Sequence, residues 1–318
     1  MKRKEGRFAA KWIAMAAAML CGLLSGCAAN APRTVPIASG IVRVDLGSTT
    51  ATLLSDGQGS RALDANFVRN VPLAEVQAER AASGEPTDRL EIPYHPLLVD
   101  IGTQRILFDT GSGEFGAAGS GKLLEGMSKA GIDPKSITAV IISHFHGDHI
   151  NGLRNKAGAL VFPNARIHVP APEWAWWMDD TRLTATPESQ RGGFNTARRV
   201  FSPIANSVVR FEPGAEVLPG VRSIAAFGHT QGHTVFMIEG GIRKLLYWAD
   251  TTNVAMFVRN PDWAVTFDMN AEMAKATRRR IADLAIRENA LVAGFHLPGA
   301  GIGTLTTRGK GYEFKPLP

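Results

Sequence analysis

Short apolar runs of strand length recur along the chain, each bounded by turn-forming residues. They predict strands at residues 41–47, 50–57, 137–144, 166–169, 221–226, 234–239 and 244–248, and a hairpin over 95–113. Apolar residues at helical spacing predict helices at 72–82, 122–129 and 270–288. Because strands and helices alternate without an internal repeat or a dividing linker, the pattern predicts one α/β domain over residues 41–318.

The first 26 residues have the layout of a secretory signal, with a basic start, MKRKEGR, before the apolar run WIAMAAAMLCGLL. The next motif, LSGC, resembles a bacterial lipobox and predicts a lipoprotein signal peptide over 1–26 with lipid modification of Cys27. Residues 27–40 are small, Pro-containing and aperiodic, as expected for a lipidated tether. The alternative is an ordinary signal peptide cleaved elsewhere, with Cys27 incidental.

This signal predicts an exported lipoprotein of a bacterial cell envelope. Ala28 is not the aspartate associated with inner-membrane retention, so we expect an outer-membrane anchor facing the periplasm. The formal net charge is +6, but residues 1–26 hold five basic residues against one acidic residue. The rest of the chain is close to neutral, which argues against a nucleic-acid partner.

Potential ligand side chains are densest in SHFHGDHING, where three of the eight histidines and one aspartate fall within six positions. His144 and His146 can point the same way from an extended segment, and Asp148 and His149 follow the turn at Gly147. Imidazole and carboxylate are the ligands of zinc-class cations, so the cluster predicts a metal site. A polar loop with Asp148 as a helix N-cap would explain the aspartate and leave the histidines unexplained.

Four further candidate ligands each follow an apolar strand: His229, His233, Asp250 and His296. An isolated histidine at a strand end is usually structural, but here each one adds to an existing cluster. Seven or eight ligands are too many for one tetrahedral ion. They suit two ions that share a carboxylate, an arrangement that enzymes use for hydrolysis.

In order and spacing these motifs resemble the metallo-β-lactamase superfamily of hydrolases. The resemblance rests on ILFDTGSG, HFHGDH, GHTQGH, WAD and GFHLPG, which span nearly all of the chain after the tether. The separations, together with RNPDWAVTFDMN, are most similar to the branch that contains methyl parathion hydrolase and related lactonases. The resemblance implies a single-domain αββα sandwich. His95 and His168 match none of the motifs, and we expect them to be structural.

The resemblance also implies how the ligands divide between two divalent metal ions. One ion would be held by His144, His146 and His229, and the other by Asp148, His149 and His296. Asp250 would bridge the two. We expect zinc, although iron, manganese and cobalt suit the same ligands. His233 is expected to orient a ligand or to face the substrate. Asp109 is expected to orient a ligating histidine, with an Asx turn before Gly111 as its alternative.

The implied mechanism is attack on an ester, lactone or phosphotriester by a hydroxide bridging the two metals, with Asp148 and Asp250 as the catalytic carboxylates. Candidate pocket residues are Trp174, Trp177, Asn253, Phe257 and Phe267. Asn253 stands where acyl-homoserine lactonases of the superfamily carry a tyrosine, and the alternative for the tryptophans is a role in the core. An apolar pocket over two cations suits a small, neutral, ester-like substrate.

Two other functions remain open, a true metallo-β-lactamase and a catalytically inactive metal-binding lipoprotein. The β-lactamase subgroup does not place an aspartate at the bridging position, which Asp250 occupies here. Loss of catalysis usually deletes a ligand, and every expected ligand is present. The sequence therefore predicts a metal-dependent hydrolase.

Overall fold

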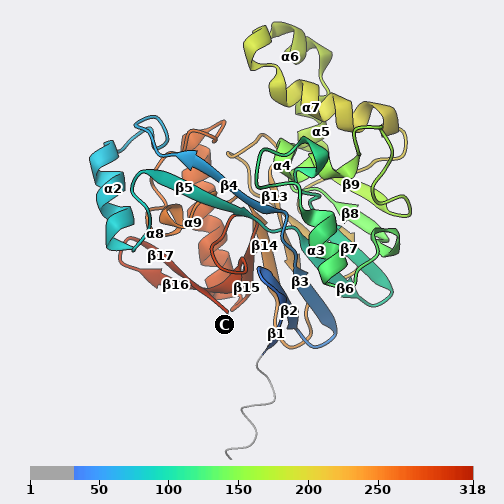
Figure 1. The fold of residues 1–318 in the computed structure, drawn as a ribbon, viewed down its shortest axis with the longest axis horizontal. Coiled ribbons are helices and arrows are strands. Elements are labelled where there is room, and N and C mark those ends of the chain that lie inside the picture. The colour runs from blue at the N-terminus through green and yellow to red at the C-terminus, as the bar shows by residue number, and fades with distance from the viewer. Residues whose placement is uncertain (1–31, 318) are drawn as a thin grey trace, which may run out of the picture.

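The computed structural model describes residues 32–317, in which two large β-sheets pack face to face between outer helices (Figure 1). This arrangement confirms the predicted αββα sandwich. The predicted signal peptide and Cys27 lie outside the described residues. Within residues 32–317, no helix is long and apolar enough to cross a membrane.

The first sheet has eight strands in the order β1-β2-β3-β6-β7-β8-β9-β10. Neighbours from β1 to β7 pair antiparallel, and those from β7 to β10 pair parallel. The strands are β1 (Arg33–Ala38), β2 (Ile41–Asp45), β3 (Thr49–Leu53), β6 (Leu97–Ile101), β7 (Gln104–Phe108), β8 (Ala139–Ile141), β9 (Arg166–Pro170) and β10 (Val209–Phe211).

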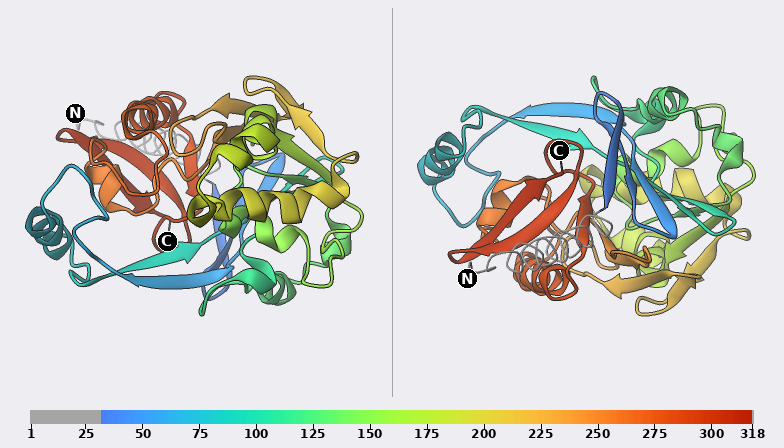
Figure 2. Two further views of the ribbon diagram at one scale, coloured as in Figure 1. Left: turned by 90° about the horizontal axis from the view of Figure 1, so that it is seen from above. Right: turned by 90° about the horizontal axis from the view of Figure 1, so that it is seen from below.

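The second sheet has seven strands in the order β11-β12-β13-β14-β15-β16-β17, and only β14 and β15 pair parallel. A separate two-stranded ribbon, β4-β5, runs toward the edge of the molecule that carries α2 (Figure 2). The strands are β11 (Glu216–Leu218), β12 (Val221–Ala225), β13 (Thr234–Ile238), β14 (Leu245–Ala249), β15 (Leu291–Gly294), β16 (Ile302–Arg308), β17 (Gly311–Pro316), β4 (Gly57–Ala62) and β5 (Arg89–Tyr94).

Helices cover both outer faces, with α3 and α9 on opposite sides of the sandwich (Figure 2). The segment after β9 forms a helical extension in which α6 and α7 project from the sheets (Figure 1). The helices are α2 (Leu73–Ala82), α3 (Leu123–Lys129), α4 (Gly147–Ile150), α5 (Ala171–Trp177), α6 (Asp180–Ala185), α7 (Gly192–Phe201), α8 (Met256–Arg259) and α9 (Ala271–Arg287). Short 3₁₀ turns lie at Gly113–Phe115, Pro134–Ser136, Asn151–Leu153, Glu188–Gln190 and Ser202–Ile204.

The strand β8 shows how the sequence pattern produces the layers. Its three residues are all buried, as its continuous apolar run predicts. Ala139 and Ile141 pack in the core between the two sheets, whereas Val140 packs in the outer core that includes α3. Because alternate residues point to opposite faces, β8 fixes the start of the following loop between two packed layers.

The sequence prediction named no strand at β1, β4, β5, β10, β11, β16 or β17, and two of these segments show why. Residues 27–40 were predicted to be an aperiodic tether, but Arg33–Ala38 forms β1 and pairs with β2, so sheet structure begins before residue 41. β4 was also missed, because GQGSRA is polar and Gly-rich and lacks an apolar alternation. Antiparallel pairing with β5 holds β4 in an extended conformation that its side chains alone do not predict.

Candidate metal centre

The seven predicted metal ligands converge at one edge of the sandwich, where four strands from both sheets end. The loop after β8 and the short helix α4 carry four of them, and the loops after β12, β14 and β15 carry one each. These ligands are His144, His146, Asp148 and His149, followed by His229, Asp250 and His296. The site therefore lies where the two sheets meet, with ligands contributed by each.

The ligands form two groups, and within each group one nitrogen or oxygen atom of every residue lies within 4.8 Å of the others. The groups are His144, His146, His229 and Asp250; and Asp148, His149 and His296. This division matches the two ligand sets that the sequence predicted, with Asp250 counted among the first.

Asp250 lies between the groups. Its Oδ2 atom is 3.3 Å from His229 Nε2 and 3.3 Å from His296 Nε2. Its Oδ1 atom is 3.1 Å from His149 Nε2. One carboxylate thus contacts histidines of both groups, which is the position required of a bridging ligand.

The protonation states of two histidines in the first group, His144 and His146, fit a metal. Burial holds the pKa of His144 well below its usual range and lowers the pKa of His146 to about 3, so both rings are neutral. His144 Nε2 is buried without a hydrogen-bond partner among the described residues. An orphaned buried imidazole nitrogen is costly unless a ligand completes it, and a divalent cation is such a ligand.

Asp109 orients His149 and is held by several donors at once. Its Oδ2 atom lies 2.8 Å from His149 Nδ1 and accepts hydrogen bonds from the hydroxyls of Tyr247 and Ser143, each at 2.7 Å. The Ser143 amide donates to Oδ1 at 2.8 Å. These donors come from three different segments, so the carboxylate does not form the alternative Asx turn. It leaves His149 Nε2 directed toward Asp250.

Asp268 performs the same task for His229, and sequence reasoning missed it. His229 Nδ1 lies 3.0 Å from Asp268 Oδ1, and Arg278 Nη2 donates to Asp268 Oδ2 at 3.2 Å. Burial opposes protonation of His229, but its contacts with Asp250 and Asp268 raise its pKa to about 9. The sequence feature that could have indicated this role is an acidic residue two positions before Asn270, the N-cap of the long helix α9.

His233 orients a ligand and belongs to neither ligand group. Its Nδ1–H donates to the Ala226 carbonyl at 2.9 Å, and its Nε2 accepts from the Asp250 amide at 3.1 Å. Both ring nitrogens are therefore used by the backbone. The ring fixes the main chain at Asp250, and His233 does not line the cavity described below.

Glu173, on α5, ties together two loops that carry ligands, and the sequence prediction gave it no role. It is fully buried and accepts hydrogen bonds from the amides of Phe145 at 3.1 Å and Gly232 at 2.8 Å. Trp177 Nε1 donates to the same carboxylate at 2.5 Å. The sequence feature that could have indicated this role is a single acidic residue within the aromatic helix APEWAWW, because a buried carboxylate needs hydrogen-bond partners.

The sequence matches the metallo-beta-lactamase superfamily over residues 93–290, which is more than half of the chain. The chain belongs to the metallo-beta-lactamase superfamily. Among solved structures, AidC, a dizinc quorum-quenching lactonase, superposes with a TM-score of 0.82 at 28% identity, over 88% of this chain and 98% of that one. The hydrolase AbOPH superposes with a TM-score of 0.80 at 23% identity, over the same shares of the two chains, and shows the fold alone.

A curated relative, ribonuclease Z of Pyrococcus furiosus, is 36% identical over 91 residues, which is 28% of this chain and 26% of that protein. The chain thus spans about a quarter of that relative's length. Together the superfamily match and its solved neighbours identify a metallo-beta-lactamase-fold hydrolase with a cluster of histidines and aspartates able to hold metal.

In this superfamily member, an open cavity of about 310 Å³ gives access to the ligand cluster. Five of the ligands line it, together with Gly147. Its other lining residues are Ile92, Tyr94, Asn253 and Phe267. Two of the five predicted pocket residues, Asn253 and Phe267, therefore lie at the cavity.

The predicted pocket role of Trp174, Trp177 and Phe257 is corrected, because none of them lines this cavity. Trp177 packs on Phe194 with ring centroids 5.0 Å apart, and Trp174 packs beneath Arg210 in the same outer core. Phe257 is fully buried in a separate core cluster between α2 and α8. These aromatic rings pack in the cores beside the site, away from the lining of the cavity.

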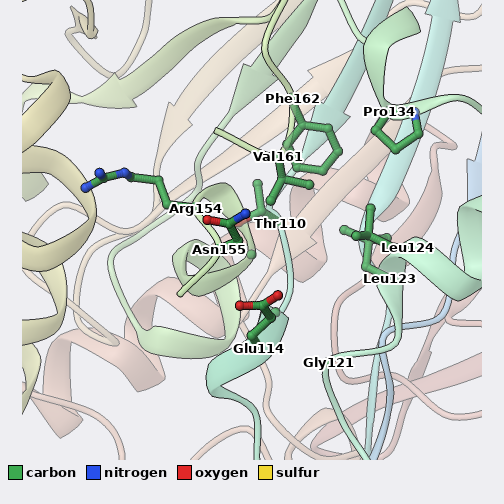
Figure 3. A pocket seen from close by; sticks show the side chains of 12 residues that line it. Thr110, Glu114, Gly121, Leu123, Leu124, Pro134, Arg154, Asn155, Val161 and Phe162 are labelled. Carbon is green, nitrogen blue, oxygen red and sulfur yellow. The ribbon is translucent and has the colours of Figure 1, made fainter. Parts of the chain in front are cut away.

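A second cavity, of about 280 Å³, lies outside the ligand cluster and contains none of the predicted ligands (Figure 3). Its wall is largely apolar and includes Leu123, Val161 and Phe162. Its polar groups already have partners, since Thr110 Oγ1 donates to the His149 carbonyl and Arg154 donates to the carbonyl of Gly158. This cavity offers no group for hydrolysis.

Proposed function

We propose that this protein is a dinuclear metal hydrolase that opens a small neutral lactone or cleaves a related ester or phosphotriester. The observation that carries this proposal is the position of Asp250, whose two oxygens contact histidines of both ligand groups. The likeness to AidC, a dizinc lactonase that binds a homoserine product, supports a lactone as the first substrate to test.

The chain's own residues would hold the two ions and handle the proton. When bound, a pair of divalent ions polarises an oxygen under attack and lowers the pKa of water, and we expect zinc in this role. Asp148 lines the cavity, and its side chain is 29% exposed, whereas that of Asp250 is 3% exposed. The neighbouring His149 and His296 outweigh burial and lower the pKa of Asp148 to about 2. It is therefore ionised at neutral pH and presents a carboxylate to the cavity.

The charge of the cavity favours a neutral substrate over a polyanion. Among the described residues, no lysine or arginine lines the cavity. Ile92 and Phe267 supply an apolar wall beside the aspartates and histidines. A polyanionic phosphodiester chain, such as the RNA implied by the name ribonuclease Z, would find no basic partner among these lining residues.

The test is a panel of initial hydrolysis rates on a lactone, an aryl ester, a phosphotriester, a β-lactam and a thioester, before and after chelation. Turnover of the lactone, ester or phosphotriester that is lost on chelation and restored by zinc supports the proposal. His146→Ala should abolish turnover, and His168→Gln, which changes a histidine outside the cluster, should not. A β-lactam preference supports the metallo-β-lactamase alternative. Metal binding without turnover of any substrate supports the inactive metal-binding lipoprotein.

The proposed location is the outer membrane, facing the periplasm, with the enzyme anchored through lipidated Cys27. LSGC at residues 24–27, after a basic and then an apolar segment, supports this proposal. The test is incorporation of labelled palmitate, followed by membrane fractionation, for the full chain and for Cys27→Ala. Label and membrane association should disappear together in Cys27→Ala, and membrane association that persists there contradicts the lipid anchor.

A further inference from the structure

Tyr94 is the last residue of β5 and lines the cavity beside Asp148, Asp250 and His296. The sequence prediction assigned it no role. It comes from the β4-β5 ribbon, which is a separate sheet from the strands that carry the metal ligands. The ribbon therefore contributes one polar side chain to a site that is otherwise built from the two main sheets.

The Tyr94 ring is held by the same segment that orients a ligand. It meets His296 edge to face, with ring centroids 5.3 Å apart at 73°, and Phe295 at 6.1 Å and 64°. The preceding residue, Pro93, offers its carbonyl to His296 Nδ1 at 2.8 Å. Two consecutive residues of β5 thus fix the ring of His296 and the ring of Tyr94 relative to each other.

Glycines on β4 make room for the phenol. Gly57 pairs with Tyr94 and Gly59 pairs with Ile92, so both glycines face the side of the ribbon that carries these two cavity residues. A Cβ atom at Gly59 would lie 2.6 Å from the Tyr94 hydroxyl oxygen. Among residues 32–317, the Tyr94 hydroxyl has no hydrogen-bond partner, and the residue lines the cavity.

We propose that the Tyr94 phenol donates a hydrogen bond to the substrate oxygen that gains negative charge during hydrolysis, on the side of the cavity next to Asp148 and His296. The inference rests on the proposed function and adds a substrate-contacting residue to it. A phenol is protonated at neutral pH and so is a donor. A fixed donor beside a developing oxyanion contributes more in the transition state than in the ground state. Asn253 also lines the cavity, but one of its two N–H donors is already engaged by Asp250 Oδ2 at 2.9 Å, whereas the Tyr94 donor is not shared with a ligand.

The experiment is a double-mutant cycle on the full chain, with Tyr94→Phe, Gly59→Ala and the combined variant. Tyr94→Phe keeps the ring contacts and removes only the donor, so kcat/KM for a hexanoyl-homoserine lactone should fall about 100- to 1,000-fold. Gly59→Ala displaces the hydroxyl and should lower kcat/KM in the wild type, yet have little further effect in the Tyr94→Phe background. Gly59 does not have a positive φ, so alanine is compatible with its backbone.

Readouts besides activity distinguish contact from structural damage. Bound metal per chain and the unfolding temperature should be unchanged in Tyr94→Phe, and calorimetric affinity for the product N-hexanoyl-L-homoserine should fall. Full kcat/KM in Tyr94→Phe, or an equal effect of Gly59→Ala in both backgrounds, overturns the role of Tyr94. A wild type that turns over no substrate in the panel instead rejects the proposed function, and the role of Tyr94 with it.

Discussion

At the scale of single residues, the site depends on groups that fix one ring nitrogen of a histidine and leave the other facing the ligand cluster. Asp109 does this for His149, and Asp268 does it for His229. Each anchor is itself hydrogen-bonded, so the ring orientation is set before any metal binds. The order of the centre thus depends on residues that are not ligands.

Replacing Asp268 by Asn should weaken metal binding about 10- to 100-fold. The amide is a weaker acceptor for His229 and cannot form an ion pair with Arg278, which now lies 3.2 Å from the Asp268 carboxylate. Competition with a chromophoric chelator measures the affinity. Asp262→Asn is the matched control, because that exposed residue pairs with Arg279 at the surface. Equal metal affinity in the two variants contradicts the role of Asp268.

The sequence could predict that these seven residues gather at one site, because histidine and aspartate are rare enough at strand ends for their spacing to be informative. It could not predict Asp268 or Glu173, whose roles depend on which loops the fold places beside them. The tryptophans of PEWAWWMDD were wrongly assigned to the pocket for the same reason. A large aromatic side chain suits a core and a pocket equally well, and only the packing distinguishes them.

At the scale of elements, α5 connects the loop after β8 to the loop after β12. Glu173 lies on this helix, and its carboxylate accepts one amide hydrogen bond from each loop. A Cβ at Gly232 would lie 2.3 Å from the Glu173 amide nitrogen, so the second loop approaches the helix backbone closely. The hydrogen bonds that Glu173 accepts from both loops therefore fix the separation between His146 on the first loop and His229 on the second.

Glu173→Gln should therefore lower both stability and metal affinity. Every group that faces the carboxylate is a donor, so a side-chain NH₂ would meet other donors and leave buried groups unpaired. The expected loss is about 1–3 kcal/mol in the free energy of unfolding. Urea unfolding with and without bound metal measures it, and Glu188→Gln on the surface is the control. An unchanged unfolding midpoint in Glu173→Gln is the contrary result.

Elements with strong apolar periodicity were predicted close to their observed bounds. The predicted helix over 270–288 is α9 (Ala271–Arg287), and the predicted strand over 244–248 is β14 (Leu245–Ala249). β1 and β4 were missed because each is largely exposed and depends on its neighbour for order. An edge strand carries little sequence signal of its own, since pairing rather than burial stabilises it.

At the scale of the whole molecule, the ligand cluster joins the two halves of the sandwich. His144, His146, Asp148 and His149 follow a strand of the first sheet, and His229, Asp250 and His296 follow strands of the second. Metal bound there would connect both sheets. Metal removal should therefore destabilise the whole domain rather than one loop.

Chelation should lower the unfolding temperature in a single cooperative transition. A ligand at 100 times its dissociation constant adds about 2.7 kcal/mol to the free energy of unfolding. Scanning calorimetry of the metal-loaded and chelated protein measures the difference, and re-addition of zinc should reverse it. An unfolding temperature that does not respond to chelation contradicts a metal that joins the two sheets.

The fold also predicts a loss of stability in acid that does not involve the ligands. Burial, together with the charge of Arg166, lowers the pKa of His168 from 6.5 to about 4. Between these values the unfolded chain binds a proton that the folded chain does not, so the free energy of unfolding falls as the pH decreases from 6.5 toward 4. His168→Gln should reduce this pH dependence, as measured by urea unfolding at pH 7, 5.5 and 4.5. Equal pH dependence in both proteins contradicts the prediction.

The most direct test of a dinuclear hydrolase is metal content measured together with lactone turnover, in the wild type, Asp250→Asn and His168→Gln. The position of Asp250 predicts two metals per chain and chelator-sensitive turnover in the wild type and in His168→Gln. Asp250→Asn should retain at most one metal and lose turnover. Two metals and full turnover in Asp250→Asn would contradict the bridging role of Asp250, and with it the proposed two-metal hydrolase.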